Sequence, residues 1–333
     1  MNKIVALLLV LLLLGAGVFF ASKKNQTEGS IDASDRHFAI KDVLSIGKIF
    51  IADRTGNTTT LDRSINNTWI LNGSEPARQE AVNTLLQTIR DLELQYIPPN
   101  AAVNTIIENI AAEGVKIEIY GTDSKIMKTY YVGGMTPDEL GTYMIMEDAK
   151  QPFVMHVPHF EGGLLYRYWM KPEQWRDKAV FRENPDNIKK VSVEYPFQTK
   201  SSFILERIGN DFQVEHLNPL KETTTKNVKK GLAEAYLYGF EEKVSEDYES
   251  KHPKKDSIIN SIPFCIINVE RMDNTKKQVE LFVTKKPKKA TKDVQMVDDL
   301  ILRYFAFVDE KDFFLTQDRV FQEILRSYDY FYD

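Results

Sequence analysis

Cysteine is almost absent from this chain, with Cys265 the single one among 333 residues. A lone cysteine cannot form an intrachain disulfide, and it excludes a structural zinc site built from cysteines. Cys265 lies in the apolar run 262–267, where no adjacent group would stabilise a thiolate. We therefore expect a buried core thiol and not a nucleophile.

An excess of charge of one sign is also lacking, as are the common catalytic motifs. The formal net charge is −5, which gives no reason to expect nucleic acid, because phosphate binding depends on clustered lysine and arginine. There is no dinucleotide-binding or Walker-type glycine run, no Gly-x-Ser-x-Gly elbow and no His-Glu-x-x-His. Catalytic triads assemble in space, so a hydrolase stays open, but these absences favour a protein that is not an enzyme and has no cofactor.

Histidine is scarce, and the five residues include one close pair, His156 and His159. Two imidazoles three residues apart would suit a metal on a helix, but Pro158 and the apolar residues 153–155 predict the end of a strand. Successive strand residues face opposite sides, which separates the two rings. We expect no metal site and retain the pair as candidate ligand or interaction residues. The glycine pairs at 133–134 and 162–163 are interpreted as turns or strand ends and not as phosphate loops.

A long hydrophobic run is present at the N-terminus. Residues 4–21 are uncharged and, as a helix, would span about 27 Å, close to the thickness of a bilayer core. The small residues 15–17 would suit a cleaved signal peptide, but the apolar run continues beyond them, which favours an uncleaved anchor. Lysines on both sides leave the orientation open, whereas the position near the N-terminus is typical of secretion. We predict a membrane anchor or signal segment at 1–21 and a polar tether at 22–42, with the body outside the cytoplasm.

The body shows internal similarity. Residues 46–51 and 188–193 both alternate as half-buried strands do. In both copies further strands, a helix and a pair of strands follow, at 60–63, 69–71, 82–92, 115–120 and 127–132 in the first and at 204–207, 212–214, 228–240, 266–269 and 279–283 in the second. The pattern predicts an α+β fold of two tandem diverged repeats, 43–182 and 183–333, behind the N-terminal transmembrane helix. Each repeat is expected to be a largely antiparallel sheet with helices packed on it.

One offset of 161 residues aligns five residues in the later part of the two copies. It pairs Tyr143 with Tyr304, Asp148 with Asp309, Phe153 with Phe314, Phe160 with Phe321 and Leu164 with Leu325.

Between the copies lies a distinctive block, Trp175, Arg176 and Asp177. In a functional interpretation Trp175 is a ligand platform and Arg176 an anion clamp. In a structural one Trp175 packs at the junction of the repeats while Arg176 and Asp177 form local ion pairs or hydrogen bonds, and we favour this second interpretation. The basic runs 251–255 and 285–289 contain proline and are interpreted as solvated loops, with docking to anionic lipid head groups as the alternative.

These motifs together resemble a known family. Residues 63–69 and the helix after them, 131–136, 141–143, 153–154 and the Trp175 block are similar to the bacterial family called domain of unknown function 4340. The resemblance implies an N-terminal membrane segment, and the link of some relatives with gliding-type ABC transport systems implies an accessory role at the envelope. No catalytic residues can be transferred from it.

The sequence is compatible with two functions. The first is a membrane-anchored, extracytoplasmic binding or scaffold protein of the bacterial inner membrane, single-pass through residues 4–21 and facing the periplasm, with a protein partner in the envelope. The alternative is a ligand-binding module or hydrolase with a cleft between the two repeats, near Trp175, Arg176, Asp177, His156 and His159. Exposed, convergent polar groups would favour the alternative, whereas buried or scattered ones would favour the first.

Overall fold

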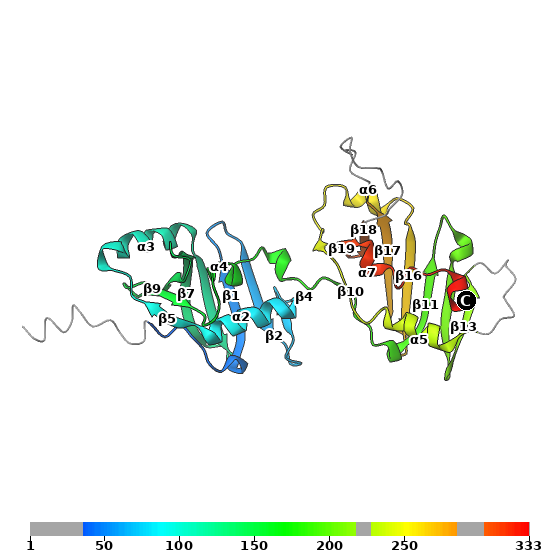
Figure 1. The fold of residues 1–333 in the computed structure, drawn as a ribbon, viewed down its shortest axis with the longest axis horizontal. Coiled ribbons are helices and arrows are strands. Elements are labelled where there is room, and N and C mark those ends of the chain that lie inside the picture. Colours follow the sequence, from blue (N-terminus) through cyan, green and yellow to red (C-terminus); the bar gives the residue numbers. More distant parts are fainter. Residues whose placement is uncertain (1–35, 218–227, 285–302, 333) are drawn as a thin grey trace, which may run out of the picture. The chain divides into compact units, whose positions relative to one another are not determined.

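The computed structural model describes residues 36–217, 228–284 and 303–332, and it divides the chain after Trp175 into two compact units (Figure 1). Both units are antiparallel sheets with helices packed on them, so the predicted α+β class is confirmed. The division lies earlier than the predicted end of the first repeat at residue 182. The reason is that the strand β10 (Ala179–Phe181) pairs with β14 (Lys243–Val244) of the second unit.

The described part of the chain contains no helix long and apolar enough to cross a membrane. The predicted anchor 4–21 lies outside the described residues, as does most of the predicted tether. The end of that tether is corrected: Phe38 is fully buried and packs edge-to-face on Tyr130 and Phe153, with ring centroids 5.6 and 6.1 Å apart. Ile40 is buried too, and its amide donates to the carbonyl of Ile89. Two alternating apolar side chains therefore bring residues 38–40 into the core of unit 1.

Unit 1 contains a nine-stranded sheet in the order β4-β3-β2-β1-β6-β7-β8-β9-β5, with every neighbouring pair antiparallel. Its strands are β1 (Ile46–Ala52), β2 (Thr58–Arg63), β3 (Trp69–Leu71), β4 (Glu75–Pro76), β5 (Glu93–Tyr96), β6 (Val115–Gly121), β7 (Ile126–Met135), β8 (Thr142–Met146) and β9 (Phe153–His156). Its helices are the 3₁₀ helices η2 (Val43–Ser45) and η3 (Pro172–Trp175) and the α-helices α2 (Gln79–Asp91), α3 (Asn100–Glu113) and α4 (Leu165–Tyr168).

Helices cover both faces of this sheet (Figure 1). The apolar residues of α2, spaced three and four apart, enter the main core together with Tyr130 and Val132 of β7. Tyr131, between those two in sequence, packs instead with Ile106 and Ile110 of α3. The alternation of β7 therefore places α2 and α3 on opposite faces.

Unit 2 contains an eight-stranded antiparallel sheet in the order β13-β12-β11-β16-β17-β18-β19-β15. Its strands are β11 (Ile188–Glu194), β12 (Phe203–Ile208), β13 (Asp211–His216), β15 (Asp247–Tyr248), β16 (Cys265–Arg271), β17 (Lys276–Val283), β18 (Arg303–Val308) and β19 (Asp312–Gln317). Its helices are η4 (Pro185–Asn187), η5 (Thr199–Ser201), α5 (Lys230–Tyr238), α6 (Lys255–Ile259), α7 (Asp318–Phe321) and η6 (Tyr328–Phe331). Unit 2 has its own core, to which α5 contributes Ala233, Tyr236 and Leu237.

The two sheets have several features in common. The order β3-β2-β1-β6-β7-β8-β9 in unit 1 has the counterpart β13-β12-β11-β16-β17-β18-β19 in unit 2. Arg63 is the last residue of β2, and Arg207 is the last but one of β12. The guanidinium group of Arg63 lies 4.7 Å from the ring of Trp69 in β3, and that of Arg207 lies 4.8 Å from the ring of Phe212 in β13. Each arginine also donates to two backbone carbonyls at or just before the start of a neighbouring strand. Arg63 donates to Val43 and Ile46 at β1, and Arg207 donates to Pro185 and Ile188 at β11.

The single offset of 161 residues does not hold through the strands β8 and β18. Tyr143 packs with the α3 cluster, whereas Tyr304 is buried in the main core of unit 2. A shift of one residue in a strand moves a side chain to the other face, so these two tyrosines are not equivalent in position. Phe153 and Phe314, in the following strands, are both core residues.

Candidate functional site

Trp175, the first residue of the predicted block, is fully buried in the core of unit 1. It ends η3, and its carbonyl accepts a hydrogen bond of 2.7 Å from the amide of Arg78, which precedes α2. Its indole nitrogen is buried without a hydrogen-bond partner among the described residues. A ring with no exposed surface cannot serve as a ligand platform, so in this structure Trp175 fastens the end of unit 1 to α2.

Arg176 and Asp177 belong to unit 2 and make local contacts. The Arg176 side chain is 7% exposed, lies 4.4 Å from the Tyr248 ring and forms an ion pair of 2.7 Å with Asp312. Asp177 pairs with Arg182 and accepts a hydrogen bond from the amide of Ala179. These contacts attach the first residues of unit 2 to its sheet and leave no exposed guanidinium to act as an anion clamp.

The histidine pair lies at the end of a strand, as its proline indicates. His156 is the last residue of β9, and His159 adopts a left-handed backbone conformation with φ of 63° in the turn after it. Over the described ranges no three His, Cys, Asp or Glu residues are grouped so that they could hold a metal ion. The glycine pairs are placed similarly: residues 133–134 lie within β7, and Gly162 occupies a turn with φ of 106°.

Cys265 begins β16 inside the core of unit 2. Burial raises the pKa of its thiol well above the usual value, and the nearby charge of Glu194 raises it further. The thiol therefore stays protonated at neutral pH and is a poor nucleophile.

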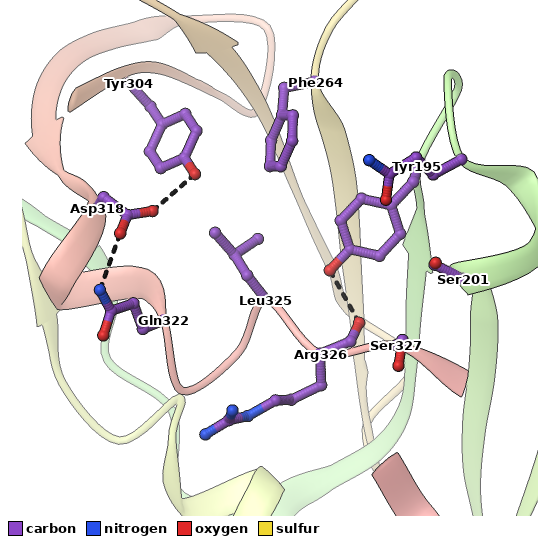
Figure 2. Close-up of a pocket in the computed structure, with 10 residues that line it drawn as sticks. Tyr195, Ser201, Phe264, Tyr304, Asp318, Gln322, Leu325, Arg326 and Ser327 are labelled. Atoms are coloured by element: carbon purple, nitrogen blue, oxygen red, sulfur yellow. Dashed lines mark hydrogen bonds between the residues drawn. The ribbon is translucent and has the colours of Figure 1, made fainter. Parts of the chain in front are cut away.

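A polar pocket of about 440 Å³ opens at one end of the unit 2 sheet (Figure 2). It lies where β11 ends and β16 and β18 begin, against the segment from α7 to η6. Ten residues line it, namely Tyr195, Gln198, Ser201, Phe264, Tyr304, Asp318, Gln322, Leu325, Arg326 and Ser327.

Hydrogen bonds hold several of these side chains in place (Figure 2). Asp318 accepts one from the Tyr304 hydroxyl (2.7 Å) and one from the Gln322 amide (2.9 Å), so both of its oxygens are engaged. The Tyr195 hydroxyl donates to the backbone carbonyl of Arg326 (2.8 Å). Burial raises the pKa of both tyrosines, and the bond to Asp318 raises that of Tyr304 further. Both hydroxyls therefore remain protonated donors at neutral pH.

Arg326 contributes the positive charge of this pocket. Its guanidinium lies 4.9 Å from the ring of Tyr330, and its Nε atom is buried without a hydrogen-bond partner among the described residues. No carboxylate among the described residues forms an ion pair with Arg326: Asp318 accepts hydrogen bonds from Tyr304 and Gln322, and Glu323 pairs with Lys243 at 2.7 Å. The hydrogen bond and charge of Lys243 lower the pKa of Glu323, and the charge of Arg326 lowers it further without an ion pair.

A second, apolar pocket of about 490 Å³ adjoins the first, since Phe264 lines both. Its wall is formed by Phe197, His252, Lys254, Ser257, Ile258, Ser261, Ile262, Phe264, Phe282, Val283 and Phe305. Three of these apolar side chains are unusually exposed: Phe197 by 72%, Ile262 by 64% and Val283 by 45%. Among the described residues, this wall contains the basic side chain of Lys254 but no carboxylate.

Sequence reasoning did not find either pocket. The lining residues come from stretches far apart in the chain, and for the run 262–267 the sequence predicted only that the thiol of Cys265 is buried. Within that run only Cys265 and Ile267 are buried core residues, whereas Ile262 is exposed. Pro263 interrupts the run before β16 begins, and this was the one available signal that its first residues lie outside the strand.

Comparison with known proteins gives one match. The family model described as Domain of unknown function (DUF4340) matches residues 69–254, more than half of the chain. The matched span crosses the division after Trp175 and ends before Phe264, so most of the polar pocket lies outside it. No curated protein and no solved structure matches the chain.

Proposed function

Since the chain belongs to the family described as Domain of unknown function (DUF4340), we propose that it is a binding protein of the bacterial envelope and not an enzyme. In this proposal residues 4–21 anchor it in the inner membrane by a single pass, and the body faces the periplasm or extracytoplasmic space. The apolar run supports the anchor. The resemblance to relatives of gliding-type systems supports an accessory role in ABC-type transport.

The two units are, in the same proposal, diverged copies of one ancestral repeat. The common strand order supports this origin, as do the equivalent contacts of Arg63 and Arg207. A further parallel supports it. In each unit the backbone amide just before a helix donates to the carbonyl of a buried aromatic residue in a 3₁₀ helix: Arg78 before α2 donates to Trp175, and Lys229 before α5 donates to Phe331.

One observation supports protein binding most directly, the exposed apolar rim formed by Phe197, Ile262 and Val283 beside the apolar pocket. Side chains of this size exposed together around a hollow are typical of a surface that a partner covers. Because the described residues of the pocket wall include Lys254 and no carboxylate, the complementary partner is a protein segment that inserts an apolar side chain flanked by acidic residues.

The chemistry of the buried groups supports binding over catalysis. The thiol of Cys265 and the hydroxyls of Tyr195 and Tyr304 all have raised pKa values, so none is a nucleophile or general base at neutral pH.

The test is capture of a partner from membranes with the full chain as bait. The variant Phe197→Asp/Ile262→Asp should lose the partner, because a carboxylate at each position opposes both apolar contact and an acidic segment. Ile208→Asp is the matched control, since Ile208 is 55% exposed but lies outside both pockets. Recovery of the same proteins by the wild type and the double variant would contradict the proposal.

The alternative of a ligand-binding module is favoured by a different observation, the polar pocket with its cation and aromatic walls. That pocket lies within unit 2 and is made by residues other than the five named from the sequence. Its lining differs from that of the apolar pocket except for Phe264.

A further inference from the structure

The polar pocket of unit 2 combines a cation with an already satisfied anion. Both Asp318 oxygens accept hydrogen bonds from Tyr304 and Gln322, which holds the carboxylate in place away from ion pairing. Arg326 lines the same pocket and has no ion pair among the described residues. The pocket therefore retains a planar cation that suits an external anion.

The position of the guanidinium is restricted by its surroundings. The Tyr330 ring packs on it at 4.9 Å, and the backbone carbonyl of Arg326 accepts a hydrogen bond of 2.8 Å from the Tyr195 hydroxyl. Figure 2 shows the side chain of Arg326 extending beneath Leu325 towards the side of the pocket that holds Gln322. A cation held in this way loses less conformational freedom on binding than a free surface arginine would.

The apolar residues that line the pocket indicate the rest of the ligand. Phe264 stacks on Tyr304, with ring centroids 5.3 Å apart, and meets Tyr195 edge-to-face at 5.9 Å. Leu325 lies between the two tyrosines (Figure 2), so an apolar surface adjoins the charged group. A ligand with an apolar body beside its charge would contact both parts of the pocket.

The charge balance selects the kind of anion. A single arginine offers one positive charge, and the negative charge of Asp318 lies in the same wall. A phosphate dianion would bring two negative charges beside Asp318 against one arginine, whereas a carboxylate brings one, which Arg326 can pair, and is therefore repelled less by Asp318.

We propose that the polar pocket around Arg326 binds the carboxylate of a ligand whose apolar body packs against Phe264 and Leu325. The site does not rest on the protein-binding role proposed above: Phe264 borders both pockets, but Arg326 lines the polar one and not the apolar one. The carboxylate belongs either to a free small acid or to the C-terminus of a peptide, which present the same chemistry to the arginine.

The experiment uses the full chain in lipid nanodiscs and phenylacetate as the probe, with binding followed by saturation-transfer NMR and empty nanodiscs as the blank. Phenylacetate should bind more tightly than phenyl phosphate, and the neutral phenylacetamide should bind roughly tenfold or more weakly than phenylacetate. Equal binding of the acid and its amide would overturn the proposal.

Variants assign the effect to the arginine. Arg326→Gln should weaken phenylacetate binding by roughly tenfold or more, and Arg326→Lys should give an intermediate loss, because lysine keeps the charge but not the planar fork. Arg319→Gln is the matched control, since Arg319 is exposed on α7 outside the pocket. A folded Arg326→Gln protein, verified by its circular dichroism, that binds phenylacetate as the wild type does would contradict the assignment.

A last comparison distinguishes the two sources of the carboxylate. N-acetylphenylalanine presents the acid as a peptide C-terminus would. Tighter binding of this probe than of phenylacetate would assign the site to peptide ends, and weaker binding would assign it to free acids. Failure of all carboxylate probes would refute the carboxylate site while leaving the partner-capture test unaffected.

Discussion

Asp53 holds a turn and a tryptophan together through one carboxylate. Its oxygens accept hydrogen bonds from Thr55, from Asn57 and, at 2.9 Å, from the indole nitrogen of Trp169. Burial alone would raise the pKa of Asp53, but the hydrogen bonds from Trp169, Asn57 and Thr55 together lower it well below its usual value. The ionised form is therefore the one that stabilises the fold.

The first prediction concerns this carboxylate. Because its folded pKa lies below its unfolded pKa, its contribution is complete above about pH 4 and is lost as the pH falls through the folded pKa. Asp53→Ala should lower the free energy of unfolding by about 2 kcal/mol at pH 7, and this difference should shrink below about pH 4. Urea unfolding at several pH values, followed by tryptophan emission, measures it, because Trp69, Trp169 and Trp175 all lie in unit 1.

Glu108→Ala is the control, since Glu108 is an exposed residue of α3. A loss in Asp53→Ala that stays the same down to pH 2 would show that the charge of Asp53 is not what stabilises the turn.

Residue type was a poor guide to role at this scale. Arginine and tryptophan often bind ligands, yet Arg176 is in an ion pair with Asp312 and Trp175 is fully buried. Arg326 has no unusual neighbours in the sequence, and its place in a pocket depends on segments such as 195–201 that are distant along the chain.

Among the elements, α3 was not predicted, although it covers one face of the unit 1 sheet. The spacing of Ala102, Ile106 and Ile110 is helical, but Pro98 and Pro99 just before it are typical of a loop. The strands were easier to predict, because alternation is a property of neighbouring residues. The close approach of α3 to β7 depends on Gly133, where a Cβ atom would lie 2.6 Å from Cγ1 of Ile110.

The second prediction tests that approach. Gly133→Ala should lower the free energy of unfolding by about 1 to 3 kcal/mol, because the added methyl group would push α3 away from the sheet. Gly134→Ala is a matched control, since a Cβ atom there would meet nothing within 4 Å. Hydrogen exchange of the α3 amides, together with urea unfolding, provides the measurement. Equal effects at the two glycines would mean that the contact with Ile110 is not the cause.

At the scale of the whole molecule, each unit has a separate hydrophobic core. Within unit 2, Glu183 and Arg271 form a two-bond ion pair, with both distances 2.6 Å and the Glu183 side chain only 4% exposed. Removal of one member of such a buried pair leaves a charge without compensation.

The third prediction follows from the separate cores. Calorimetry of the full chain should resolve two unfolding transitions, since a unit with its own core can unfold by itself. Asp53→Ala should shift one transition. Arg271→Ala, which should cost about 3 to 5 kcal/mol, should shift the other and leave tryptophan emission unchanged until unit 1 unfolds. A single transition that both variants shift equally would contradict independent unfolding.

The α+β class, the antiparallel strands and the family could be recognised from the order of residues, because hydrophobic alternation and helical spacing are local properties of the chain. The tandem duplication and the membrane anchor stay predictions, the latter on residues 4–21, which lie outside the described part of the chain.

The two pockets could not be recognised in this way. Tyr195, Phe264, Tyr304 and Arg326 meet because β11 ends, and β16 and β18 begin, at the same end of one antiparallel sheet, next to the segment that follows α7. Such a meeting depends on strand order and on packing between residues more than a hundred positions apart, which no local pattern records. Only the tertiary structure therefore determines the polar and the apolar pocket, which share Phe264.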